Sequence, residues 1–153
     1  MRLQITLLFI SALAAACWDL RQRRIPNWLT LAAFIAGIGL HSAADGTAGL
    51  SASVLGAAVG AIPFALVYWL GGMGAGDVKL MAGVGALFAW PAVCLALFCI
   101  VLAGGLLGLV KIGMHLYQRR GGTKIPGSLR RLELPYGVAI AVGTCVTIFL
   151  GML

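Results

Sequence analysis

Residues 71–79 read Gly-Gly-Met-Gly-Ala-Gly-Asp-Val-Lys, and they separate two long apolar runs. Glycine is used where a chain turns tightly or where another backbone comes close. Asp77, within this stretch, is one of only four acidic residues in the chain of 153. A carboxylate at the edge of hydrocarbon is costly and usually marks a function. We therefore predict a functional site around Asp77.

The composition predicts an all-α, polytopic membrane protein. The chain is 61% hydrophobic and 10% charged, whereas a soluble domain is typically about 45–50% apolar and about 25% charged. The apolar runs are continuous, which excludes the alternating pattern of a membrane β-barrel. We expect one integral-membrane domain that covers residues 1–153.

Apolar segments separated by turn-forming or polar residues predict six transmembrane helices. They cover residues 3–18, 28–40, 50–70, 78–90, 92–114 and 135 to the end. Trp90-Pro91 divides a run that is too long for one span. In the third segment, Pro63 predicts a kink, and Gly56-x-x-x-Gly60 predicts close helix packing. A cleaved signal peptide is the alternative for the first segment, and the arginines that follow it disfavour that reading.

Basic residues predict the orientation. The segments 19–27, 71–79 and 111–134 carry three, one and six Lys or Arg residues, whereas residues 41–49 and the Trp90-Pro91 turn carry none. The positive-inside rule places the first group in the cytoplasm and both termini in the periplasm. The net charge of +7 therefore indicates membrane orientation and contact with anionic lipids at the cytoplasmic face, rather than nucleic-acid binding.

This orientation brings Asp19 and Asp77 to one face, although they lie far apart in sequence. Two adjacent carboxyls can hydrolyse a peptide bond: the ionised one takes a proton from water, and the protonated one polarises the scissile carbonyl. Gly74 and Gly76 would let an extended substrate lie beside Asp77, while Lys79 would tune its charge or anchor the interface. This chemistry needs no metal or cofactor, and the four cysteines lack zinc-ligand spacing.

Structural alternatives remain open for both acids. Asp19 is alternatively a solvated loop acid paired with Arg21 or Arg23, and Asp77 is alternatively a helix N-cap. Two other functions also stay open: a small ion- or proton-coupled transporter or channel whose intramembrane acid binds cations or protons, and a structural subunit of a secretion apparatus.

The other titratable groups are not expected to join the site. Asp45 is predicted at the opposite face, and Glu133 is predicted to pair with Arg130 or Arg131. His41 and His115 are predicted at opposite interfaces.

The motifs resemble a known family. Gly74-Ala75-Gly76-Asp77 resembles the GxGD motif of membrane aspartyl proteases. Three further features resemble the type IV prepilin peptidases, in the same order along nearly the whole chain. They are Asp19 followed by Arg23-Arg24-Ile25-Pro26-Asn27, then Gly76-Asp77-Val78-Lys79-Leu80, and lastly Pro135-Tyr136-Gly137-Val138-Ala139.

The resemblance implies an aspartyl endopeptidase of the bacterial inner membrane, with Asp19 and Asp77 as its catalytic pair. It would remove the leader of membrane-inserted pilin or pseudopilin precursors at the cytoplasmic face. The chain lacks the paired-cysteine insertion associated with N-methylation in larger members, so methyltransferase activity is not expected. Its length resembles that of the short peptidases of Flp/Tad-type pilus systems. The sequence does not indicate an oligomeric state.

Overall fold

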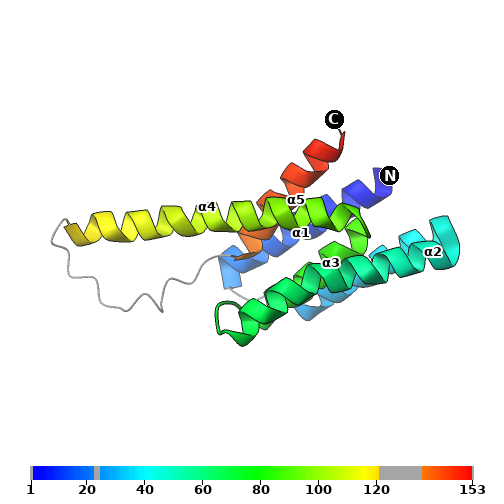
Figure 1. Ribbon diagram of the computed structural model, residues 1–153, viewed down its shortest axis with the longest axis horizontal. Coiled ribbons are helices and arrows are strands. Elements are labelled where there is room, and N and C mark those ends of the chain that lie inside the picture. The colour runs from blue at the N-terminus through cyan, green and yellow to red at the C-terminus, as the bar shows by residue number, and fades with distance from the viewer. Residues whose placement is uncertain (1, 23–24, 121–135, 153) are drawn as a thin grey trace.

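The computed structural model describes residues 2–22, 25–120 and 136–152, and the regular structure within these ranges is helical. The chain order is α1 (Arg2–Gln22), α2 (Asn27–Trp69), α3 (Ala75–Phe88), α4 (Ala92–Arg120) and α5 (Tyr136–Met152) (Figure 1). The predicted all-α class is confirmed. The predicted turn at Trp90-Pro91 is also found, between the end of α3 and the start of α4.

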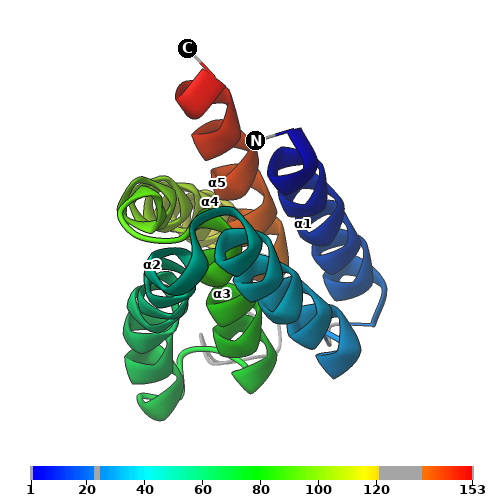
Figure 2. The same cartoon turned by 90° about the vertical axis from the view of Figure 1, so that its right-hand side faces the viewer.

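Helix α2 consists of two arms that fold back on each other at Gly46 (Figures 1 and 2). Gly46 has φ 60° and ψ −132°, a conformation that residues with a Cβ rarely adopt. The arms are tight at this turn, because a Cβ on Gly49 would collide with the carbonyl of His41. The polar loop predicted over residues 41–49 is therefore wrong: one glycine makes the turn, and the chain stays helical on both sides of it.

Helix α3 is the centre of the bundle and packs chiefly against α2 (Figure 2). A Cβ on Gly56 would run into the carbonyl of Gly85, and one on Gly60 would lie 2.7 Å from the carbonyl oxygen of Met81. The two backbones are thus in direct contact, which confirms the close packing predicted for Gly56-x-x-x-Gly60. Pro63 lies inside the second arm of α2. The residue of α2 whose φ and ψ depart from helical values is Gly46 and not Pro63.

The carboxyl end of α3 is held by polar side chains from other helices. The Leu87 carbonyl oxygen accepts a 2.7 Å hydrogen bond from Gln4 Nε2 and lies 3.1 Å from His41 Nε2. Ser53 Oγ donates to the Ala86 carbonyl oxygen at 2.9 Å. Backbone carbonyls at a helix end in apolar surroundings need such partners. Helix α1 and both arms of α2 therefore hold the carboxyl end of α3 in place. His41 was predicted at an interface, and it is half-buried in this cluster.

Large apolar side chains cover the outside of the bundle. Trp69 is 81% exposed and Leu109 is 69% exposed, which would be unfavourable in water. Three stretches, Leu3–Arg21, Asn27–Trp69 and Ala92–Met114, are long and apolar enough to cross a membrane, and Tyr136–Gly151 is a shorter apolar helix. The chain is therefore an integral membrane protein. Helix α4 continues past the predicted end of its span, to Arg120.

Candidate active site

The glycine-rich stretch ends α2 and starts α3 within a few residues. Gly71 has φ +75°, and its N–H donates to the Tyr68 carbonyl at 2.9 Å, while the Gly72 N–H donates to the Val67 carbonyl at 2.9 Å. This pair of bonds around a left-handed residue is a Schellman motif, which favours glycine at that residue. The stretch therefore reverses the chain and delivers Asp77 at a fixed place.

Asp77 lies in the first turn of α3. Gly74 is the N-cap, and the Asp77 N–H donates to the Gly74 carbonyl at 3.2 Å. The carboxyl of Asp77 in turn hydrogen-bonds to the Gly74 backbone, as an acid at the third helical position does in a capping box. The alternative in which Asp77 is itself the N-cap is therefore wrong, although its side chain still contributes to capping.

Asp19 lies near the carboxyl end of α1, whose helix continues to Gln22. The prediction that Asp19 lies in a loop is wrong, because α1 extends past the end of its apolar run. The backbone N–H of Gly137, in the first turn of α5, donates to Asp19 Oδ2 at 2.9 Å. A Cβ on Gly137 would lie 2.8 Å from that same oxygen. Glycine is thus required where α5 meets α1.

The two acids interact electrostatically. The pKa of Asp77 is raised to about 6: burial raises it most, the nearby Asp19 carboxyl also raises it, and the backbone hydrogen bond from Gly74 partly offsets both. Desolvation and a neighbouring like charge both disfavour ionisation of a carboxyl. The fold therefore brings Asp19 and Asp77 into one site, at the meeting of the end of α1 with the starts of α3 and α5.

The other predicted site residues lie around this pair. Gly74 is exposed, whereas a Cβ on Gly76 would lie 3.4 Å from the Ile25 side chain. Lys79 Nζ donates a 3.0 Å hydrogen bond to Asn27 Oδ1. Lys79 therefore links the start of α3 to the start of α2. The role of these residues in binding substrate stays a prediction.

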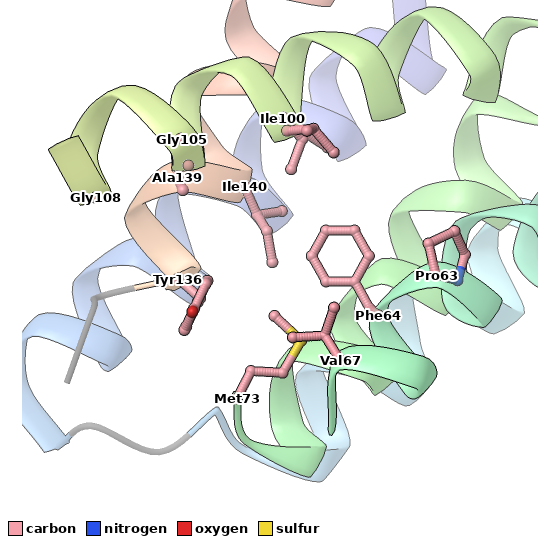
Figure 3. A pocket seen from close by; sticks show the side chains of 12 residues that line it. Pro63, Phe64, Val67, Met73, Ile100, Gly105, Gly108, Tyr136, Ala139 and Ile140 are labelled. Atoms are coloured by element: carbon pink, nitrogen blue, oxygen red, sulfur yellow. The ribbon is translucent and has the colours of Figure 1, made fainter. Parts of the chain in front are cut away.

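Tyr136 is a site residue that the sequence reasoning did not select. Its phenol lies within the electrostatic reach of Asp77. It also lines an apolar groove of about 390 Å³ between α2, α4 and α5 (Figure 3). The available signal was its place in the Pro135–Ala139 motif, directly before Gly137.

Several predicted groups fall elsewhere. Asp45 is exposed beside the Gly46 turn, away from the acid pair. Arg23, Glu133, Arg130, Arg131 and most of the basic segment 111–134 lie outside the residues described, and so do the predicted pairings of Arg23 and Glu133.

The fold and the site define a class: a helical membrane protein that holds two coupled carboxyls where three helix ends meet. Comparison with known families then assigns the chain. Residues 6–109 match the type IV leader peptidase family, and the chain belongs to this family of peptidases. The family predicted from the sequence motifs is confirmed.

Curated relatives agree with the family. Proteins named prepilin leader peptidase/N-methyltransferase match over most of this chain. The one from Burkholderia pseudomallei is 32% identical over 148 residues, covering 91% of this chain and 43% of the relative. That from Aeromonas hydrophila is 29% identical, covering 87% and 44%. That from Xanthomonas campestris is 31% identical, covering 87% and 45%. The chain thus spans less than half the length of these relatives. No solved structure matches it.

Proposed function

We propose that this protein is a membrane-embedded aspartyl endopeptidase that removes the leader peptide of type IV prepilin-like precursors. One observation carries the proposal: Asp19 and Asp77 lie close enough for the Asp19 carboxyl to raise the pKa of Asp77. The family is one of leader peptidases, and the matched relatives are named for prepilin leader cleavage. The proposal covers leader cleavage alone and not the N-methyl transfer in the relatives' names.

The proposed mechanism divides the work between the two acids. Asp77 acts in its protonated form, which its raised pKa of about 6 favours, and donates a hydrogen bond to the scissile carbonyl oxygen. Asp19, whose Oδ2 accepts from the Gly137 N–H, takes a proton from the attacking water. The resulting tetrahedral intermediate collapses with cleavage of the C–N bond, as Asp19 passes the proton it took from water to the leaving amine and becomes a carboxylate again.

The proposed topology has six passes through the bacterial inner membrane, with the acid pair at the cytoplasmic side. Either arm of α2, 27–45 and 47–69, would be about 30 Å long, close to the thickness of a bilayer core. The distribution of Lys and Arg supports this orientation. Anionic lipids are the expected partners of the basic segment at this face.

Co-expression with prepilins encoded in the same bacterium tests the proposal. We expect the wild-type protein to shorten at least one prepilin by its leader, as read by a mobility shift and by mass spectrometry of its new N-terminus. Asp45→Asn, which removes an exposed acid far from the pair, is the matched control and should process normally. Absence of processing of every such prepilin would overturn the proposal.

A further inference from the structure

An apolar groove runs along the bundle towards the acid pair. It lies between the second arm of α2, the middle of α4 and the start of α5, and its volume is about 390 Å³ (Figure 3). Within the described part of the chain, the side chains that line it carry no charge. Phe64 and Ile140 line it deep in the bundle, and Met73 and Tyr136 line it near the glycine stretch.

The α4 wall of this groove is rich in glycine, beside Ile100 and Val101. Gly104, Gly105 and Gly108 line it. A Cβ on Gly105 would meet nothing within 4 Å, in contrast to Gly56, whose missing side chain lets α2 and α3 touch. Glycine in a helix interior costs about 1 kcal/mol relative to alanine. Within the described part of the chain, no packing contact at Gly105 offsets that cost. The absence of a side chain at this position therefore leaves space into which the backbone of another molecule could fit.

One end of the groove lies next to the candidate active site. Met73 directly precedes Gly74, which caps the helix that carries Asp77. Tyr136 directly precedes Gly137, which binds Asp19. Tyr136 is also the lining residue that lies in the electrostatic field of Asp77. A chain that leaves the groove at this end therefore arrives at both carboxyls.

We propose that this groove binds the apolar transmembrane helix of the substrate, packed against the glycine face of α4, so that the scissile bond next to that helix reaches Asp19 and Asp77. From Ile100 to Gly108 the groove follows α4 for about 12 Å, or about two helical turns of a bound helix. Small-residue faces are where membrane helices approach most closely. This inference rests on the proposed function, because it names where that substrate docks.

Gly105→Leu tests the inference by filling the groove, with Gly39→Leu as its matched control. Both are exposed helical glycines with nothing within 4 Å of an added Cβ, and Gly39 lies on the first arm of α2, away from the groove. Initial rates are measured with a purified prepilin that retains its apolar helix. We expect Gly105→Leu to raise KM tenfold or more, with Gly39→Leu within twofold of the wild type. If Gly105→Leu folds poorly, Gly105→Ala takes its place as the smaller change. We expect its KM to lie above the wild-type value and below a tenfold increase.

A photo-crosslinking amino acid at position 105, in an Asp77→Asn background that retains substrate, gives the second readout. Adducts with the apolar helix of the prepilin from position 105, and none from position 39, support the inference. Adducts confined to lipid, or to a second copy of the chain, overturn it, and so does a KM for Gly105→Leu within twofold of the wild type. Should the wild-type protein cleave no prepilin, the proposed function fails and the docking proposal falls with it. If the wild-type protein cleaves prepilin and the KM of Gly105→Leu stays within twofold of the wild type, the docking proposal fails and the proposed function stands.

Discussion

The backbone N–H of Gly137 donates a 2.9 Å hydrogen bond to Oδ2 of Asp19, across 118 residues of sequence. The same contact leaves no room for a side chain at position 137, since a Cβ there would lie within 3.0 Å of three atoms of Asp19. The start of α5 thereby fixes the position of a carboxyl that α1 carries. This relationship explains why a glycine follows Tyr136.

Gly137→Ala is expected to lower kcat by about 10- to 100-fold, because the new methyl group pushes Asp19 away from its place and small displacements of reacting groups are costly. Prepilin cleavage by the purified variant measures this effect. Gly151→Ala in the same helix is the control, because a Cβ there would meet nothing within 4 Å. Equal activity of the two variants would mean that the position of Asp19 does not matter for cleavage.

The cleavage rate is expected to follow the protonation of Asp77. Its pKa is raised to about 6, so the protonated form required for the acid role decreases about tenfold for each pH unit above that value. The rate should therefore rise as the pH falls from 8 to 6. The pH profile of kcat/KM measures this, and a rate that keeps rising between pH 6 and 8 would contradict the assignment of Asp77 as the acid.

The same raised pKa predicts an effect on stability. A carboxyl whose pKa is about 6 in the folded protein and 3.8 when unperturbed binds its proton more tightly in the folded state. Its stabilising contribution is fully present below about pH 3.8 and is lost as the pH rises through 6. Asp77→Asn, which cannot ionise, should therefore raise the melting temperature relative to the wild type more at pH 8 than at pH 4. Asp45→Asn is the control for a general removal of charge. If Asp77→Asn changed the melting temperature equally at pH 8 and pH 4, the result would argue against a desolvated Asp77.

Ser53→Ala is expected to destabilise the fold by about 1–2 kcal/mol, because it leaves the carbonyl of Ala86 without its side-chain partner at the end of α3. Ser51→Ala is the matched control on the same arm, since Ser51 is exposed and bonds only to the carbonyl of Ala48 in its own helix. Thermal unfolding in detergent compares the two. If Ser51→Ala costs as much as Ser53→Ala, the polar cluster does not anchor α3.

The parts of the fold that depend on local pattern were predictable. Continuous apolar runs indicated helices, Trp90-Pro91 indicated a turn, and Gly56-x-x-x-Gly60 indicated close packing. The charge distribution also led to the expectation that Asp19 and Asp77 lie together, and the two acids do interact.

Features that depend on contacts distant in sequence were not predictable. Periodicity alone could not show that α1 passes Asp19 or that one glycine, Gly46, replaces a whole loop. His41 was predicted at an interface because the sequence does not show its partner. That partner is the carbonyl oxygen of Leu87, which lies 46 residues further along the chain, in α3. Tyr136 carries no charge, and its relation to Asp77 appears only when α5 is placed against α3.

The most direct test of the acid pair is the initial rate of prepilin cleavage by purified wild-type protein, Asp19→Asn, Asp77→Asn and the control Asp45→Asn. The variants keep the shape of the side chain and remove the ionisable group. We expect Asp19→Asn and Asp77→Asn each to lose at least about 100-fold in kcat, as removal of a general acid or base does, while Asp45→Asn retains the wild-type rate. Cleavage by Asp19→Asn or Asp77→Asn at the wild-type rate would contradict the account.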